Sequence, residues 1–152
     1  MKYLKLYEYY NNLEAKLAKY NIVNYTINND GTIDVDGDVD LSFSLLGEIP
    51  FKFNKVEGNF YCFRNKLKSL EGCPNYIGGA FNCSFNELIS LKGCPEYVGG
   101  DFYCSYNQLV NLKESPKHID GDIFYCVFNN IKFIPYNIDL EKNYIFQIIQ
   151  LI

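Results

Sequence analysis

The chain has little of what most catalytic and metal sites need. It contains one histidine, His118, no tryptophan, and no C-x-x-C pair among its 6 cysteines. Zinc sites use clustered Cys and His ligands, and one histidine without a nucleophile beside it does not make a catalytic triad. We therefore expect no enzymatic activity, no cofactor and no metal site.

Long runs of one residue type are also missing. No apolar stretch has the length of a membrane span, and no apolar segment of a signal peptide follows the first residues. No run of Lys and Arg occurs, and the net charge of -4 disfavours a protein that coats duplex nucleic acid. With 48% hydrophobic and only 21% charged residues, the chain should fold. These observations predict a cytoplasmic protein without direct contact to membranes or nucleic acid.

What the sequence does contain is one phrase in four copies. They read FYCFRNKLKSLEGCP, FNCSFNELISLKGCP, FYCSYNQLVNLKESP and FYCVFNNIKFIP. Their cysteines lie 21, 21 and 22 residues apart: Cys62, Cys83, Cys104 and Cys126. A fixed period of this length is typical of a solenoid, in which each repeat forms one coil and neighbouring coils share a core. A weaker copy begins near Val39.

The spacing within the phrase predicts which side chains face the core. The phenylalanines alternate with the cysteines at a period of two, so both sets should point inward: Phe60, Phe81, Phe102 and Phe124. Asparagines recur where the chain leaves the strand, and their amides can bond to the backbone of their own and the neighbouring coil: Asn65, Asn86, Asn107 and Asn129. Stacked strands hold side chains parallel, a poor geometry for disulfides, so we expect reduced core cysteines.

The phrase F-x-C-x-x-N-x-L-x-x-L resembles the leucine-rich-repeat segment L-x-L-x-x-N-x-L. It is most similar to the short, cysteine-containing variety found in bacterial and phage proteins, and the resemblance covers about residues 56–135. It implies one parallel strand per coil, stacked into a curved sheet. The expected fold class is therefore α+β, a leucine-rich-repeat-like solenoid.

The two ends differ from the repeats, and we expect them to cap the solenoid. Apolar residues at three- and four-residue steps predict a helix over 2–20, followed by a hairpin over 22–27 and 32–41. The dense apolar segment 144–152 either folds over the last coil or joins two copies in a homodimer. The whole chain, 1–152, then forms a single domain: an N-terminal cap over 1–38, the solenoid over 39–135 and a C-terminal cap over 136–152.

Outward-facing positions that vary between coils are the candidates for function. They are rich in tyrosine and phenylalanine, whose large rings give contact area at a low entropic cost. For Phe85, Tyr106 and Phe128 a second interpretation stays open, in which the rings only stack and stabilise the sheet. Ser84, Ser105 and Val127 should face outward in the row of Phe63. The candidate residues are Tyr61, Phe63, Arg64, Asn82, Phe85, Asp101, Tyr103, Tyr106, Tyr125 and Phe128.

Five acidic residues between positions 30 and 40 form a strongly charged stretch. Asp34, Asp36 and Asp38 alternate with apolar residues, which favours a solvated strand face whose negative charge steers a basic partner. In the order D-x-D-G-D they also resemble the opening of a calcium loop. Leu45 and Leu46 occupy the place of its distal acid, so calcium binding is the less favoured alternative.

Together these features predict a protein–protein interaction module that acts by binding and occlusion. The aromatic strand face would anchor the partner and the acidic N-terminal edge would steer it. The acidic charge and the resemblance to phage proteins suggest one specific role, an inhibitor that covers the basic channel of a host defence nucleoprotein. The alternative is a structural or self-assembling protein joined through its C-terminal apolar tail.

Overall fold

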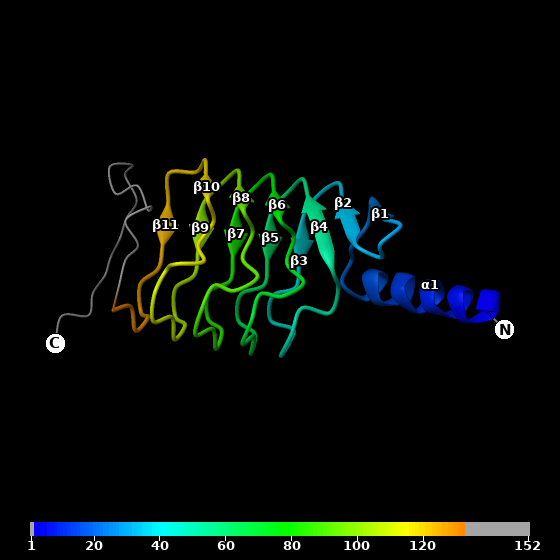
Figure 1. Cartoon of the computed structure of the whole chain (residues 1–152), viewed down its shortest axis with the longest axis horizontal. Coiled ribbons are helices and arrows are strands. Elements are labelled where there is room, and N and C mark those ends of the chain that lie inside the picture. The colour runs from blue at the N-terminus through cyan, green and yellow to red at the C-terminus, as the bar shows by residue number, and fades with distance from the viewer. Residues whose placement is uncertain (1, 133–152) are drawn as a thin grey trace.

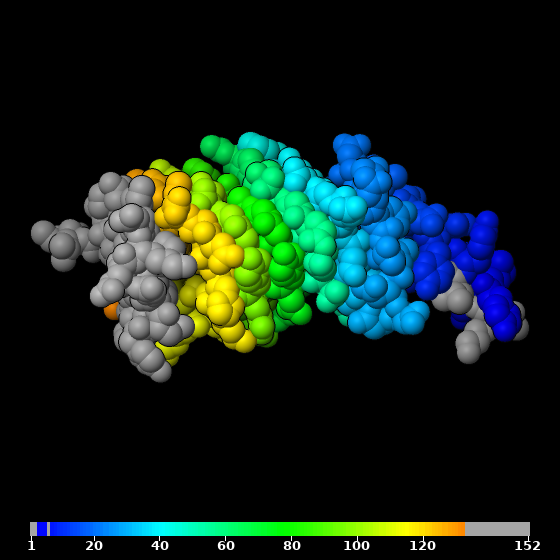
Figure 2. Space-filling view, turned by 90° about the horizontal axis from the view of Figure 1, so that it is seen from above, coloured from blue at the N-terminus to red at the C-terminus, as the bar shows by residue number. Residues whose placement is uncertain are grey.

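The chain forms a parallel β-solenoid with an α-helix at its N-terminal end (Figure 1). The structure is a computed structural model, and it describes residues 2–132. Each repeat contributes two short strands, and the strands of successive coils pair into two separate sheets. Figure 2 shows the coils as bands that cross the long axis in sequence order.

Both sheets follow the order of the repeats. Sheet A contains, in spatial order, β1 (Tyr25–Ile27), β2 (Ile33–Val35), β4 (Phe53–Val56), β6 (Tyr76–Ile77), β8 (Tyr97–Val98) and β10 (His118–Ile119). Sheet B contains β3 (Val39–Asp40), β5 (Phe60–Tyr61), β7 (Phe81–Asn82), β9 (Phe102–Tyr103) and β11 (Phe124–Tyr125). All of these pairs are parallel except β1 with β2.

The register between coils is the one that the repeat period predicts. In sheet B, Phe60 pairs with Phe81, and Phe81 pairs with Phe102. Phe124 still pairs with Phe102, because the extra residue of the 22-residue step lies in the turn between β10 and β11. Equivalent residues therefore lie on adjoining rungs, about 4.8 Å apart.

The predicted core is confirmed. The four strand phenylalanines stack along the solenoid with ring centroids 5.9, 5.6 and 4.9 Å apart, and each is at most 1% exposed: Phe60, Phe81, Phe102 and Phe124. The cysteines of the same strands are buried with them. All six cysteines are free thiols, as predicted from the parallel side-chain geometry.

The predicted role of the asparagines is also confirmed. The Asn86 amide nitrogen donates to the Cys62 carbonyl of the previous coil at 3.0 Å and to the Cys83 carbonyl of its own coil at 3.1 Å. Its Oδ1 accepts from the Leu67 N–H at 3.0 Å. The side chain thus satisfies backbone groups beyond the strand end, where no ladder partner exists. The same pattern recurs at Asn65, Asn107 and Asn129.

The return side of each coil differs from what the resemblance implied. We expected one strand per coil, but the segments before the glycine turns form the strands of sheet A, with Ile77 and Val98 fully buried. Gly99 permits this close stacking, because a Cβ there would lie 2.3 Å from the Gly78 carbonyl oxygen. The broader class, a parallel β-solenoid, is confirmed, but two sheets replace the single curved sheet.

The N-terminal helix, α1, spans Lys2–Lys19 and covers the first coil only in part. Leu17 is fully buried and Leu13 packs beside it, whereas Tyr3 and Tyr7 are 86% and 65% exposed. The predicted helix is confirmed, but only the C-terminal part of its apolar stripe packs on the first coil. A helix of 18 residues is about 27 Å long and extends past the short strands that it meets (Figure 1). No helix in the described part of the chain is long and apolar enough to cross a membrane.

The predicted hairpin is confirmed, with Thr26 opposite Asp34, but its second strand ends at Val35 instead of residue 41. At Gly37 the backbone has a φ of 145°, and the chain turns from sheet A into β3 of sheet B. Strand β2 also pairs with β4, so the hairpin is continuous with sheet A. The C-terminal cap over 136–152 and the contact through 144–152 lie outside the described residues.

Burial of the thiols predicts a loss of stability at alkaline pH. Burial raises the pKa of Cys126 to about 11, whereas a thiol in the unfolded chain ionises near pH 8.5–9. Between these values the unfolded state releases a proton that the folded state keeps, so the free energy of unfolding falls as pH rises above 9. Urea titrations at pH 7, 9 and 10 should show this fall. Cys126→Ala should make it shallower by up to about 1.4 kcal/mol per pH unit, and equal slopes would contradict the prediction.

Candidate functional site

One row of exposed side chains follows the turns after the strands of sheet B. These turns lie along the lower edge of the solenoid in Figure 1. In every coil the residue at this position has a left-handed backbone, with φ between 53° and 56°. We call this row the aromatic ladder, and its members are Phe43, Arg64, Phe85, Tyr106 and Phe128.

The members of the aromatic ladder stack on one another. The rings of Phe85 and Tyr106 lie 4.2 Å apart and 9° from parallel, and those of Tyr106 and Phe128 lie 4.3 Å and 20° apart. The Arg64 guanidinium lies 4.5 Å from the Phe85 centroid and 5.6 Å from that of Phe43. The rings nevertheless remain 38–66% exposed. The rings are therefore stacked and exposed to solvent at the same time.

The backbone of the aromatic ladder is strained for the residues that occupy it. A left-handed conformation costs roughly 1–2 kcal/mol for a residue other than glycine and is rare for bulky side chains. Asparagine or glycine would relieve that strain, yet four of the five ladder positions carry Phe or Tyr. Strain that recurs at an exposed position is a pointer to function rather than to stability.

Tyr106→Asn should change the free energy of unfolding by about 1 kcal/mol or less. The lost stacking, worth roughly 0.5–1.5 kcal/mol, is offset because asparagine tolerates a left-handed backbone. Tyr106→Ala loses the stacking without that relief and should be the less stable variant. Urea unfolding of both variants tests this, and a loss above 3 kcal/mol in Tyr106→Asn would show that the aromatic ladder is mainly structural.

A second aromatic row lies on the outward face of sheet B. Its members are half-buried, and the Tyr103 and Tyr125 centroids lie 6.5 Å apart: Tyr61, Asn82, Tyr103 and Tyr125. Burial is the main cause that raises the pKa of Tyr61 and Tyr103, so both phenols stay neutral at physiological pH. Phe63 links the two rows, with its centroid 5.2 Å from Phe43 and 6.4 Å from Tyr61.

The rest of the Phe63 row does not face outward. Ser84, Ser105 and Val127 are only 2–6% exposed, so that prediction is wrong for them, and Phe63 itself is half-buried. The in–out alternation ends here because the next residue turns the chain through its left-handed backbone. The serine hydroxyls instead bond to the backbone of the following coil, for example Ser105 to the Tyr125 carbonyl at 3.1 Å.

The predicted aspartates do not form one negative edge. Asp34 lies in sheet A and accepts from Asn54 at 2.8 Å, whereas Asp38 accepts from the Asn59 N–H at 2.7 Å beside sheet B. Asp36 lies exposed at the corner between them. Asp101 accepts from the Ile123 N–H and the Tyr103 hydroxyl, so it belongs to the sheet-B face.

The calcium alternative finds no support in this arrangement. A calcium loop wraps its carboxylates around one point, but the chain changes sheet between Asp34 and Asp38. Within residues 2–132, no group of three or more His, Cys, Asp and Glu side chains is placed to hold a metal ion.

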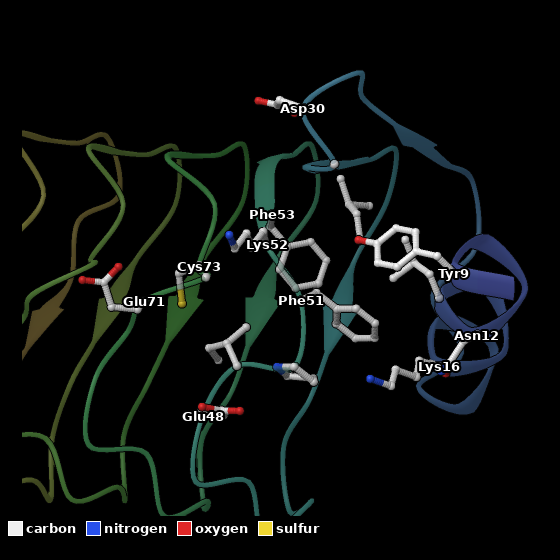
Figure 3. A pocket seen from close by; sticks show the side chains of 16 residues that line it. Tyr9, Asn12, Lys16, Asp30, Glu48, Phe51, Lys52, Phe53, Glu71 and Cys73 are labelled. Carbon is white, nitrogen blue, oxygen red and sulfur yellow. The ribbon is translucent and has the colours of Figure 1, made fainter. Parts of the chain in front are cut away.

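A cleft of about 760 Å³ lies between α1 and the first coil (Figure 3). Phe51 and Phe53 line its floor, Tyr9 and Lys16 approach from α1, and Glu48 adds the opposite charge. The two floor rings are only 5–6% exposed. These two rings are therefore less accessible to a partner than the rings of the aromatic ladder are.

Several residues of this surface were not among the sequence predictions. Phe43 begins the aromatic ladder in the degenerate coil, and counting 21 residues back from Arg64 would have found it. Two further outward rows follow in the same turns, where most coils alternate between buried and more exposed positions. We call the aromatic ladder together with these rows the ladder side; the added residues are Leu45, Lys66, Glu87, Gln108 and Asn130, then Lys68, Ile89, Val110 and Lys132.

The fold and this surface define a small parallel β-solenoid with an exposed aromatic side. Comparisons with protein-family models, with curated proteins and with solved structures gave no match. The function is therefore inferred from the surface itself.

Proposed function

We propose that the protein is a binding module that holds another protein on its ladder side and the adjoining face of sheet B. The observation that carries the proposal is the aromatic ladder, in which strained, exposed rings recur in coil after coil. Rigid aromatic side chains are typical anchors of protein interfaces. The proposal assigns occlusion rather than catalysis to the chain.

The area of a standard protein interface favours a partner that contacts both surfaces. Five rungs at about 4.8 Å, with outward rows spread over about 13 Å of chain, give a ladder side of about 250 Å². A standard interface buries about 800 Å² on each partner. The sheet-B face continues this surface through Phe63, so a partner that reaches both obtains more of the area that it needs.

The test compares two aromatic pairs of like chemistry. Phe85→Asn with Tyr106→Asn removes ring contacts from the aromatic ladder, whereas Tyr76→Asn with Tyr97→Asn removes a pair stacked at 4.8 Å on sheet A. We expect affinity capture from the source cell to lose its partner only in the first variant. The captured protein, once purified, should bind the wild type in calorimetry. Equal capture by both variants would refute the proposal.

A narrower form of the proposal concerns the source of the protein and the partner that it inhibits. The phrase F-x-C-x-x-N-x-L supports kinship with leucine-rich repeats of bacteria or phages and, with the chain's acidity, a cytoplasmic inhibitor of a host defence nucleoprotein. Exposed acids such as Asp36 would face the basic channel. A gel-shift assay tests this form, since added protein should abolish nucleic-acid binding by the target.

A further inference from the structure

The ladder side is cationic although the whole chain is acidic. Its outward rows carry four cations and one acid: Arg64, Lys66, Lys68 and Lys132 against Glu87. The full chain has 14 basic and 18 acidic residues. The ladder side therefore has a net positive charge beside the exposed rings.

These cations have no acidic partner within the described chain, whereas three lysines elsewhere, Lys55, Lys92 and Lys117, each have one. Lys92 pairs with Glu71 at 3.2 Å, and Lys117 pairs with Glu96 at 2.9 Å. The cations of the ladder side form no ion pair with any residue in 2–132. Arg64 is instead held over the Phe43 and Phe85 rings.

Apolar side chains are interleaved with this charge. Ile89 and Val110 are 61% and 43% exposed in the row that also carries Lys68 and Lys132. The stacked rings turn their edges outward, and an aromatic edge carries partial positive charge. The surface thus offers apolar contacts and positive charge together.

We infer that the segment bound on the ladder side is an acidic and apolar stretch of protein. Its carboxylates would meet the unpaired lysines and the ring edges, and its aliphatic or aromatic side chains would cover Ile89, Val110 and the rings. This inference rests on the proposed function and specifies the partner's chemistry. The aspartates near residue 36 lie at the corner between the two sheets and are not part of this surface.

Single-stranded nucleic acid is the competing polyanion, and the geometry disfavours it. Such chains bind by stacking bases on exposed aromatic faces. From Phe85 to Phe128 those faces cover one another at 4.2 and 4.3 Å, so a base finds no free face between these three rings.

The test uses a library of random 14-residue peptides. Peptides that bind the double variant Phe85→Asn, Tyr106→Asn are removed first, and the rest are selected for binding to the immobilised wild type. We expect the enriched pool to combine excess Asp and Glu with Leu, Ile and Phe. An enriched pool that is neutral or basic would overturn the inference and leave the proposed function standing. No enrichment over the depleting variant would overturn both.

An enriched peptide then allows a matched comparison of charge. The double variant Lys66→Gln, Lys68→Gln removes two positive charges from the ladder side. Its control, Lys92→Gln, Lys117→Gln, removes two positive charges from elsewhere on the surface. By fluorescence anisotropy at 50 mM salt, the first variant should bind roughly tenfold more weakly and the second about as well as the wild type. Equal losses in both variants, or tighter binding of a labelled 15-nucleotide oligo-dT than of the peptide, would overturn the inference.

Discussion

Asn86→Ala should lower the free energy of unfolding by about 3 kcal/mol. The substitution leaves the buried Leu67 N–H without its acceptor and removes one donor each from the Cys62 and Cys83 carbonyls. These two carbonyls keep a second donor, from Asn65 and Asn107, so the N–H is the main loss. Urea denaturation followed by circular dichroism measures the change.

A suitable control for this substitution is Asn75→Ala. Asn75 is exposed, and its expected effect stays within about 0.5 kcal/mol. Because each coil is stable only against its neighbours, Asn86→Ala should weaken the solenoid as a whole. Similar values for the two variants would mean that the buried amides contribute little to holding the coils together.

Gly99→Ala should prevent folding or reduce the free energy of unfolding by about 3 kcal/mol or more. Its new methyl group would lie 2.3 Å from the carbonyl oxygen of Gly78 in the previous coil. The obstacle is backbone in a stacked rung, so it cannot move aside without separating the coils. Thermal unfolding, or the yield of folded protein, reports the effect.

Gly47→Ala provides the matched comparison for this glycine. No atom lies within 4 Å of a Cβ built on Gly47, so alanine there should change stability by about 0.5 kcal/mol or less. If Gly99→Ala and Gly47→Ala had the same melting temperature, the coils would be less closely stacked than in this structure.

The repeat itself was sufficient to predict the core and the register. Residues that recur every 21 positions must occupy equivalent sites, so Phe81 and Phe102 had to lie on adjoining rungs. The amide ladder followed from the same logic, because a polar residue that recurs beside core positions must satisfy backbone groups. Asn86 is the clearest case.

The second sheet could not be predicted in the same way. Its strands in the repeats, such as Tyr76–Ile77, are two residues long, too short to show the alternation of apolar and polar residues by which a strand is predicted. They become strands only because the preceding coil supplies hydrogen-bond partners, for instance the Val56 carbonyl for the Gly78 N–H. Sequence alone could therefore identify a solenoid but not its number of sheets.

The proposed binding surface, too, could be predicted from the sequence only in part. The sequence by itself determined that aromatic residues recur at outward positions, because the period had already assigned the recurring phenylalanines and cysteines to the core. Only the tertiary structure decided that one row adopts a left-handed backbone and stacks from Phe43 through Arg64 to Phe128. It also placed beside this row lysines that form no ion pair within residues 2–132. Backbone conformation at a turn, and the charges that meet there, depend on how neighbouring coils stack, and residues far apart in sequence come together only after that stacking.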